Sequence, residues 1–193
     1  MRTCFCTILI LIFTTSTVFS QTDKTDRIKI MGPFYKFSLA TTLHINEDSN
    51  TDSDAPLIIP NGFFINNTVG FQFDKRSSIS LNFEYDLYSK QALHFFPAYL
   101  EFKYNILRFE VINDDGTIYQ NNLFLRGGYG TLLSMGKSFE KGNYLKLGIG
   151  YQLQVDDSNN SILIGLDFSR KRFGYETLEG LSSVSIFLEF MVF

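Results

Sequence analysis

The sequence has no tryptophan, two histidines and four prolines, and its two cysteines, Cys4 and Cys6, lie at the very start. They fall within a pattern typical of an export signal, in which Arg2 precedes the apolar run 5–13 and a small polar segment. That run is too short to span a bilayer, and we expect cleavage after Ser20.

The exported chain, residues 21–193, then contains no cysteine. This excludes disulfides, thiolate catalysis and cysteine-ligated metals, and it argues against a lipoprotein. We expect residues 21–193 to form one domain.

Long apolar runs and strong charge are also absent from the exported chain. Its longest uncharged stretch, 55–73, contains two prolines and three asparagines and is therefore not a membrane helix. The formal net charge of the whole chain is only −3, and no basic stripe is interleaved with aromatic residues. We therefore expect no nucleic-acid partner.

The chain does contain eight segments in which apolar and polar residues alternate. They are 35–44, 63–73, 79–88, 98–105, 123–133, 145–154, 162–169 and 183–192. Segment 79–88 is the clearest, because Leu81, Phe83 and Tyr85 alternate with Asn82 and Glu84. Successive side chains of a strand point to opposite faces, so each segment predicts a strand with one uncharged face. The fold class is therefore all-β.

Alternation alone does not decide which face is outside. A soluble barrel or sandwich would bury the apolar face, whereas a membrane barrel would turn it toward lipid. Glycines gather on the polar face, at Gly128, Gly130, Gly148 and Gly150 among others, as expected in a crowded lumen. Charges of both signs share that face, and aromatic residues lie near segment ends. These features favour the membrane arrangement.

Several stretches carry a resemblance. The segments LKLGIGYQLQ at 145–154 and FPAYLEFKY at 96–104, the GGYG at 127–130 and the terminal Phe193 resemble small outer-membrane β-barrel proteins of the Bacteroidetes type. The resemblance implies an eight-stranded antiparallel up-and-down transmembrane barrel, located in the outer membrane of a Gram-negative cell and assembled by machinery that reads the last strand. In the usual terminal signal, apolar residues occupy every second position counted back from the final Phe, on the same face of the strand. Here Glu189 occupies one of those positions. A bulge near the end would reconcile the two.

The expected topology places the C-terminus on the periplasmic side. The outer loops are then 46–61, 89–92, 134–143 and 170–181, and the inner connections are 74–77, 106–122 and 156–160. The long connection 106–122 is interpreted as an extra hairpin, with a bulge near Ile106 because the apolar parity changes there. It either continues the strands past the membrane or contacts a periplasmic partner.

A barrel of eight strands has an interior filled by its own side chains. We therefore expect a paired network of lumen charges formed by Lys36, Glu84, Asp86, Glu101, Lys103, Arg126, Lys146 and Asp167. Because unpaired buried charge costs several kcal/mol per ion, most of these residues should pair. Glu84, Glu101, Lys103 and Arg126 are expected to form its core.

Candidate chemistry is sparse. His44 and His94 lack the spacing of a metal pair, and neither is followed two residues later by serine, as in outer-membrane lipid A deacylases. The acidic cluster of Asp48, Asp52 and Asp54 lacks the glycine turn and distal glutamate of a calcium loop. No catalytic, cofactor or metal site is predicted.

One basic cluster is a candidate for lipid binding. Arg170, Lys171 and Arg172 lie at the predicted outer end of the seventh strand, where they would meet lipopolysaccharide phosphates. The alternative is a charged loop that keeps the rim wetted.

The sequence therefore predicts a non-enzymatic outer-membrane barrel with a structural or accessory role, open to membership in a larger outer-membrane complex. Its expected partners are outer-membrane lipid, including lipopolysaccharide, and other envelope proteins. The alternatives are a lipid A-modifying enzyme, a secreted soluble barrel that binds an apolar ligand and, with less support, a small solute channel.

Overall fold

The computed structural model describes residues 31–45, 58–89, 92–112, 118–136, 141–155, 159–175 and 178–193. The described chain forms the strands β1 (Gly32–Ile45), β2 (Ile58–Gln72), β3 (Ser77–Tyr88), β4 (Leu93–Phe95), β5 (Pro97–Ile112), β6 (Ile118–Leu132), β7 (Gly142–Gln154), β8 (Ser161–Tyr175) and β9 (Leu178–Val192). The expected export signal lies outside the described residues. Within them, no helix is long and apolar enough to cross a membrane.

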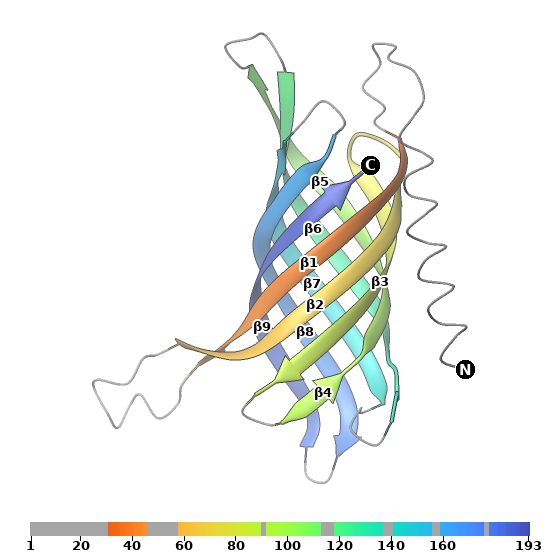
Figure 1. Ribbon diagram of the computed structural model, residues 1–193, viewed down its shortest axis with the longest axis vertical. Helices are drawn as coiled ribbons and strands as arrows, with labels where there is room; N and C mark the ends of the chain where they lie inside the picture. The colour runs from red at the N-terminus through yellow and green to blue at the C-terminus, as the bar shows by residue number, and fades with distance from the viewer. Residues whose placement is uncertain are drawn as a thin grey trace, which may run out of the picture.

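The strands close into one antiparallel barrel (Figure 1). Apart from β4 and β5, strands that follow one another in sequence pair with each other, and the sheet closes where β1 pairs with β9, from Tyr35↔Val192 to Leu43↔Val184. The short β4 and the long β5 both pair with β3 and are separated only by Phe96, so together they make one stave. The barrel therefore has eight staves, as the alternation predicts.

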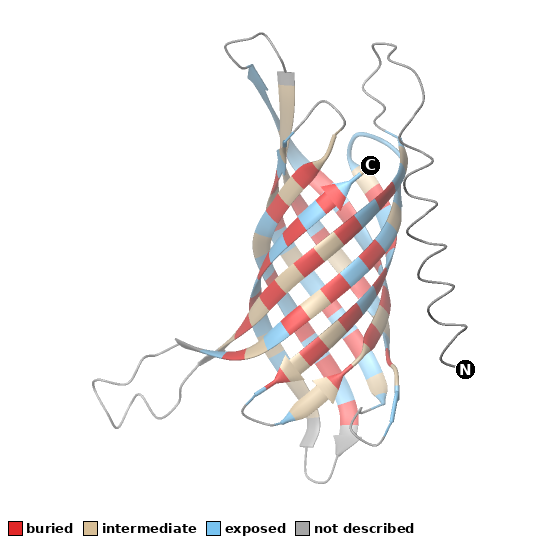
Figure 2. Cartoon of the chain, in the orientation of Figure 1, coloured by how far each residue is buried: buried red, intermediate tan, exposed pale blue. Residues whose placement is uncertain are grey.

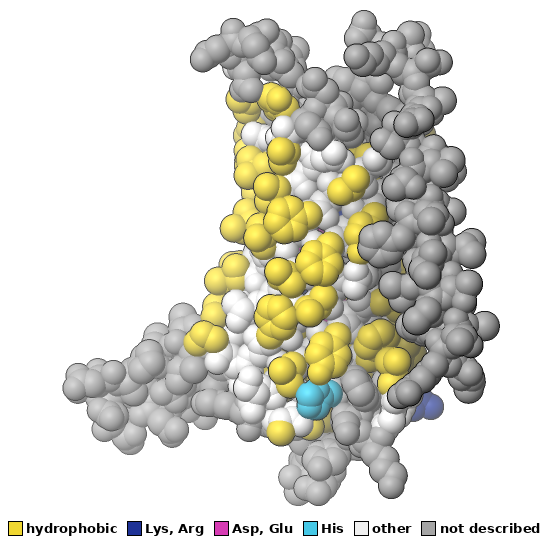
Figure 3. Space-filling view, in the orientation of Figure 1, with side chains coloured by type: hydrophobic (Ala, Val, Ile, Leu, Met, Phe, Trp, Pro, Cys, Tyr) yellow, Lys and Arg dark blue, Asp and Glu magenta, His cyan; other side chains and the backbone are white. Residues whose placement is uncertain are grey.

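Buried and exposed residues alternate along the strands (Figure 2), and the charged face of the sheet is the buried one, so it points inward. Phe83, Leu100 and Leu147 are 41%, 58% and 50% exposed on the outer face. Their sequence neighbours Glu84, Glu101 and Lys146 are 0%, 2% and 4% exposed. In the space-filling view, hydrophobic side chains spread over the wall of the barrel (Figure 3). A soluble barrel with an apolar interior is therefore ruled out as an alternative, since such a barrel would show the opposite arrangement.

Glycine makes room for large side chains inside the barrel. A Cβ at Gly128 would lie 2.7 Å from Cδ2 of Tyr99, and one at Gly150 would lie 2.6 Å from Cζ of Phe124. These distances are shorter than any normal carbon–carbon contact, so interior rings occupy the space that a side chain would need. The enrichment of glycine on the polar face thus has the expected cause.

The connection 106–122 is the extra hairpin that the sequence predicts. β5 and β6 remain paired out to Ile112↔Ile118, and their register shifts between Asn105 and Leu107, at the expected bulge. The shift keeps apolar side chains on the outer face, because Leu107, Phe109 and Val111 are all exposed. In Figure 1 this ribbon projects beyond the neighbouring strands.

One expectation about the strands is wrong: most of the predicted outer loop 170–181 is strand, since β8 continues to Tyr175 and β9 begins at Leu178. The β1–β9 register is regular from Val184 to Val192, so no bulge there reconciles Glu189 with the usual terminal pattern. Instead, the Phe193 ring packs against Phe34, with ring centroids 5.8 Å apart. The side chain of Phe193 therefore lies on the lumen-facing side of the barrel wall.

Candidate functional site: the charged interior

The barrel interior concentrates charge. The structure buries ten Lys, Arg, Asp and Glu side chains there, five basic and five acidic, so their formal charges sum to zero. They are Lys36, Lys103, Arg126, Lys146, Lys171, Glu84, Asp86, Glu101, Asp167 and Glu189. All eight residues expected in the lumen network lie inside, and Lys171 and Glu189 join them. In an interior of low dielectric, such a balance limits the cost of burying the ions.

Arg126, on β6, is the centre of the largest cluster. Its guanidinium binds the carboxylate of Asp167 in a bidentate manner, with Nε–Oδ1 and Nη2–Oδ2 distances of 2.9 and 2.6 Å. Its Nη1 lies 2.5 Å from Oε1 of Glu189 and 3.8 Å from Oε2 of Glu101. Lys36 completes the cluster, 2.9 Å from Glu101 and 3.4 Å from Glu189. The cluster joins β1, β5, β6, β8 and β9 across the lumen.

The Arg126 cluster is also packed against an apolar ring. The guanidinium carbon lies 3.9 Å from the centroid of Phe187, which is a close cation–π contact. Ser38 donates a hydrogen bond to Oε1 of Glu189 at 2.7 Å. The fork geometry of arginine, its ring contact and the shared carboxylates together fix this part of the interior in one arrangement.

A second cluster surrounds Glu84 of β3. Lys146 of β7 lies 2.6 Å from Oε2 of Glu84 and 3.3 Å from Oδ2 of Asp167, so it links the two clusters. The hydroxyl groups of Tyr144 and Tyr99 donate hydrogen bonds to Glu84 at 2.7 and 3.1 Å. Glu84 therefore belongs to this cluster rather than to a core shared with Glu101.

Lys171 of β8 forms a third cluster. Its ammonium group lies 2.7 Å from Oδ2 of Asp86 and donates a hydrogen bond to the Tyr88 hydroxyl at 2.9 Å. Four aromatic rings surround the same ammonium group at 4.9–5.6 Å, those of Phe64, Tyr88, Phe95 and Tyr144. Such a cage suits a cation that has lost its water.

This position corrects one expectation. Lys171 is 0% exposed and points into the lumen, so it does not face lipopolysaccharide phosphates. The strand continues through Arg170 and Arg172, whose side chains are exposed. Alternation along β8 could have predicted this, because Lys171 lies on the same face of the strand as Asp167 and Ser169.

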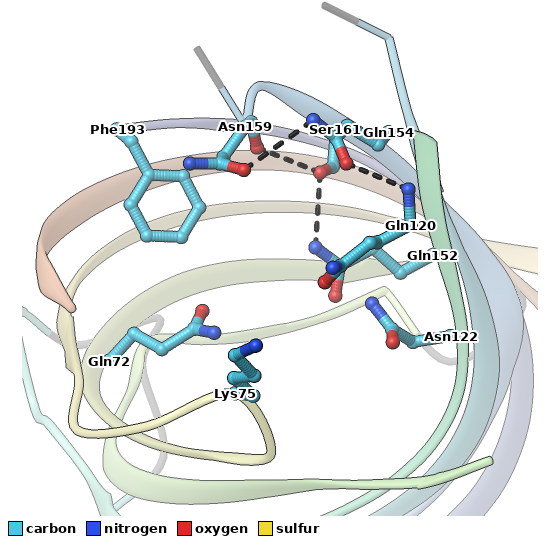
Figure 4. A pocket seen from close by; sticks show the side chains of 9 residues that line it. All are labelled: Gln72, Lys75, Gln120, Asn122, Gln152, Gln154, Asn159, Ser161 and Phe193. Carbon is cyan, nitrogen blue, oxygen red and sulfur yellow. Dashed lines mark hydrogen bonds between the residues drawn. The ribbon is translucent and has the colours of Figure 1, made fainter. Parts of the chain in front are cut away.

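Lys103 differs from the other buried cations. Among the described residues it forms no ion pair; its ammonium group donates a hydrogen bond to Gln152 at 2.7 Å and lies 5.3 Å from the ring centroid of Phe124. Gln152 in turn lines a small polar cavity at the end of the barrel that holds the C-terminal residue (Figure 4). Lys103 therefore lies apart from the core in which the sequence placed it.

The cavity is bounded by amide side chains together with Lys75, Ser161 and Phe193. Its volume is about 30 Å³, room for about two water molecules. Pockets that hold organic ligands are at least tenfold larger. Gln152 donates to the Ser161 hydroxyl, and Gln154 accepts from the backbone N–H of Gln120 and donates to Oδ1 of Asn159, so the lining residues also bond with one another. The cavity is too small for an organic ligand, and the clusters beyond it fill the lumen.

The two histidines were weighed above as catalytic or metal-binding residues. The side chain of His94 lies at the barrel rim, with Nδ1 2.9 Å from the Tyr85 hydroxyl. His44 belongs to β1, but its side chain and the acidic loop residues lie outside the described part of the structure. No group of metal-binding side chains occurs among the residues that are described.

No protein-family model and no curated protein matches this chain. Among solved structures, the chain is similar to the crystal structure of Neisserial surface protein A (NspA), with a TM-score of 0.53, 10% identity, and coverage of 83% of this chain and 96% of that chain. The N-terminal β-barrel domain of Pseudomonas aeruginosa OprF gives a TM-score of 0.42 at 10% identity, covering 82% and 96%.

At such low identity the likeness to NspA shows the fold alone. The chain is a closed, eight-stranded antiparallel barrel of the kind found among outer-membrane barrels.

Proposed function

We propose that the protein is an integral outer-membrane barrel with a non-enzymatic, structural or accessory role. The single observation that supports this most is the inverted distribution of side chains. Leu81, Leu100 and Leu147 face outward at 43% exposure or more, while the described ionic clusters are buried. In water, a protein with such an apolar surface would associate or aggregate. A barrel that spans a bilayer needs an apolar surface of this kind where it meets hydrocarbon. The assignment to Bacteroidetes-type bacteria stays a prediction from the sequence motifs.

The filled lumen favours a structural role over solute transport. Arg126 and Lys146 connect carboxylates from opposite sides of the interior, and a solute would have to break several of these short ion pairs to pass. Small barrels of this kind offer their outer wall, loops and strand ends for contact with other molecules. We infer that contact, not passage, is the task.

The projecting β5–β6 hairpin is the part best suited to contact another envelope protein. Leu107, Phe109 and Val111 are exposed along it. On its open edge, β5 pairs with β3 only as far as Tyr104, so within the described residues the strand beyond has no ladder partner on that side. Exposed apolar side chains and a free strand edge together suit the addition of a partner's extended segment.

Lipopolysaccharide is the lipid partner that the rim favours. Arg170 and Arg172 are exposed at the end of the barrel opposite the projecting hairpin. Guanidinium groups bind phosphate through paired hydrogen bonds, so these two residues are suited to lipid phosphates in the outer leaflet.

The first experiment distinguishes a non-enzymatic barrel from a lipid-modifying enzyme. The full-length chain is expressed in its natural host, membranes are fractionated, and lipid A from a deletion strain is compared with wild type by mass spectrometry. The proposal requires protein in the detergent-extracted outer-membrane fraction and unchanged lipid A. A new lipid A species in the deletion strain would establish enzymatic activity instead.

The second experiment tests the accessory role. The protein is purified in mild detergent as wild type and as a Phe109→Ser, Val111→Ser variant, with Leu147→Ser on the barrel wall as the control. A stoichiometric envelope protein should accompany wild type and the control but not the hairpin variant. Recovery of wild type with no companion protein would count against the accessory role.

A further inference from the structure

One polar pair interrupts the apolar outer wall. Asn67 of β2 is exposed on the outer face, and its Oδ1 accepts a hydrogen bond from the Tyr35 hydroxyl at 2.5 Å. Its strand neighbours are apolar, because Asn67 pairs with Phe37 of β1 and Phe83 of β3. Other outward amides on the described strands lie near strand ends, at Asn121 and Asn143.

The position of Asn67 places it well within the apolar band. It lies six positions before Phe73, where the turn after β2 begins. For a strand tilted by about 40°, six residues correspond to a height of roughly 15 Å, in a band that is about 25 Å tall. If the barrel spans the membrane as proposed above, this amide faces hydrocarbon and not the headgroups.

Hydrocarbon offers no partner to an amide. The Tyr35 hydroxyl satisfies one lone pair of Oδ1, while the Nδ2 group has two donors, and no described side chain accepts a hydrogen bond from them. Polar groups in such a place are costly unless a neighbouring protein completes their hydrogen bonds. The amide therefore needs a partner that presents both an acceptor and an apolar surface.

We propose that this partner is a second copy of the chain, joined through the outer wall of β1, β2 and β3 with Asn67 at the centre. A two-fold axis along the membrane normal keeps both barrels in the same orientation and brings each residue of the patch to its own counterpart. An amide is self-complementary, because the Nδ2 of one Asn67 can donate to the Oδ1 of the other. The flanking Phe37 and Phe83 would pack around that contact.

Cross-linking in membranes tests the proposal. Val69 is 56% exposed, two residues from Asn67 on the same face, and Leu147 is 50% exposed on β7, across the barrel from β2. Cys4 and Cys6 fall within the segment expected to be cleaved, so single-cysteine variants carry one thiol. A short bifunctional maleimide should link Val69→Cys into dimers and leave Leu147→Cys monomeric.

Adding Asn67→Leu to Val69→Cys should lower the dimer fraction, since hydrogen bonds between membrane segments change association roughly three- to twenty-fold. Tyr35→Phe, which removes one hydrogen bond but leaves the amide, should keep the dimer. Equal cross-linking of Val69→Cys and Leu147→Cys, or cross-linking unchanged by Asn67→Leu, would overturn the proposal.

Labelling with a water-soluble maleimide distinguishes a failure of the dimer proposal from a failure of the proposed function, which places the barrel in the membrane. If the barrel is in the membrane, neither cysteine is labelled before detergent is added. Rapid labelling of both in intact membranes would refute the membrane assignment itself, and the dimer proposal with it.

Discussion

Replacing Arg126 is the sharpest perturbation of the interior, because one guanidinium serves three carboxylates. In Arg126→Met the described lumen keeps four of its five cations against five carboxylates, which leaves a net charge of −1. Asp167 retains Lys146 at 3.3 Å, and Glu189 retains Lys36 at 3.4 Å, so neither carboxylate is left without a cation. The contact with Phe187 is also lost.

Removing one partner of a buried ion pair costs about 3–5 kcal/mol. Because each carboxylate keeps one ammonium partner, we expect the lower half of this range, about 3–4 kcal/mol, in the free energy of unfolding. The measurement is reversible urea unfolding of the barrel in lipid vesicles, followed by far-ultraviolet circular dichroism since the chain has no tryptophan.

Two further variants identify the cause. Arg126→Met with Asp167→Asn restores equal numbers of cations and carboxylates and should recover at least half of the lost free energy. Arg172→Met, at an exposed position, should change stability by no more than about 0.5 kcal/mol. The reasoning fails if Arg126→Met costs under about 1 kcal/mol, or if the double variant is less stable than the single one.

Three other predictions follow from named contacts. Gly128→Ala should destabilise the barrel by about 1–3 kcal/mol in the same unfolding assay, whereas Gly127→Ala, whose Cβ meets only Leu147 at 3.5 Å, should be nearly neutral; equal effects would contradict the packing account. Lys171→Met should destabilise the barrel without changing lipopolysaccharide binding by vesicle flotation, and Arg170→Ser with Arg172→Ser should do the reverse; a loss of lipopolysaccharide binding in Lys171→Met would show that its side chain reaches the surface. The backbone N–H groups of Arg76 and Ser77 each donate to the Asp74 carboxylate at 2.6 Å and hold the pKa of that carboxyl below its usual value of 3.8. The stabilisation of the turn by Asp74 is therefore complete at neutral pH and is lost as the pH falls through the lowered pKa. An NMR titration midpoint of Asp74 at or above 3.8 would disprove this prediction.

Which residues share a face was predictable, because the strand repeat places Phe83 and Glu84 of segment 79–88 on opposite sides of the sheet. Which face is outside needed more than the repeat: the glycines and mixed charges of the polar face assigned it to the lumen, as the structure has it. The bulge near Ile106 was predictable from the repeat, since a change of apolar parity requires an extra residue.

The end of β8 was missed because charge was treated as a sign of a loop. Arg170, Lys171 and Arg172 are consecutive, and such a run usually lies in solvent, but a strand directs its middle member to the opposite face. Partners across the lumen were likewise beyond the sequence. Lys146 meets Glu84 from a strand 62 residues away, and only the closed barrel determines that distance.

The sequence left the C-terminal strand undecided, because a bulge near its end would reconcile Glu189 with the usual terminal pattern. The structure leaves the register regular and places the Phe193 ring beside Phe34 instead. Local pattern does not reveal that an interior ring has a partner at the barrel mouth.

The central claim is that the outer wall touches hydrocarbon, and a tryptophan placed on it tests this most directly. The chain has no tryptophan, so Leu147→Trp provides a single fluorescent reporter on β7, and Met135→Trp provides one in the exposed connection after β6. In vesicles with brominated acyl chains, we predict strong quenching of Leu147→Trp and little quenching of Met135→Trp. An unquenched, water-like emission from Leu147→Trp would contradict the account.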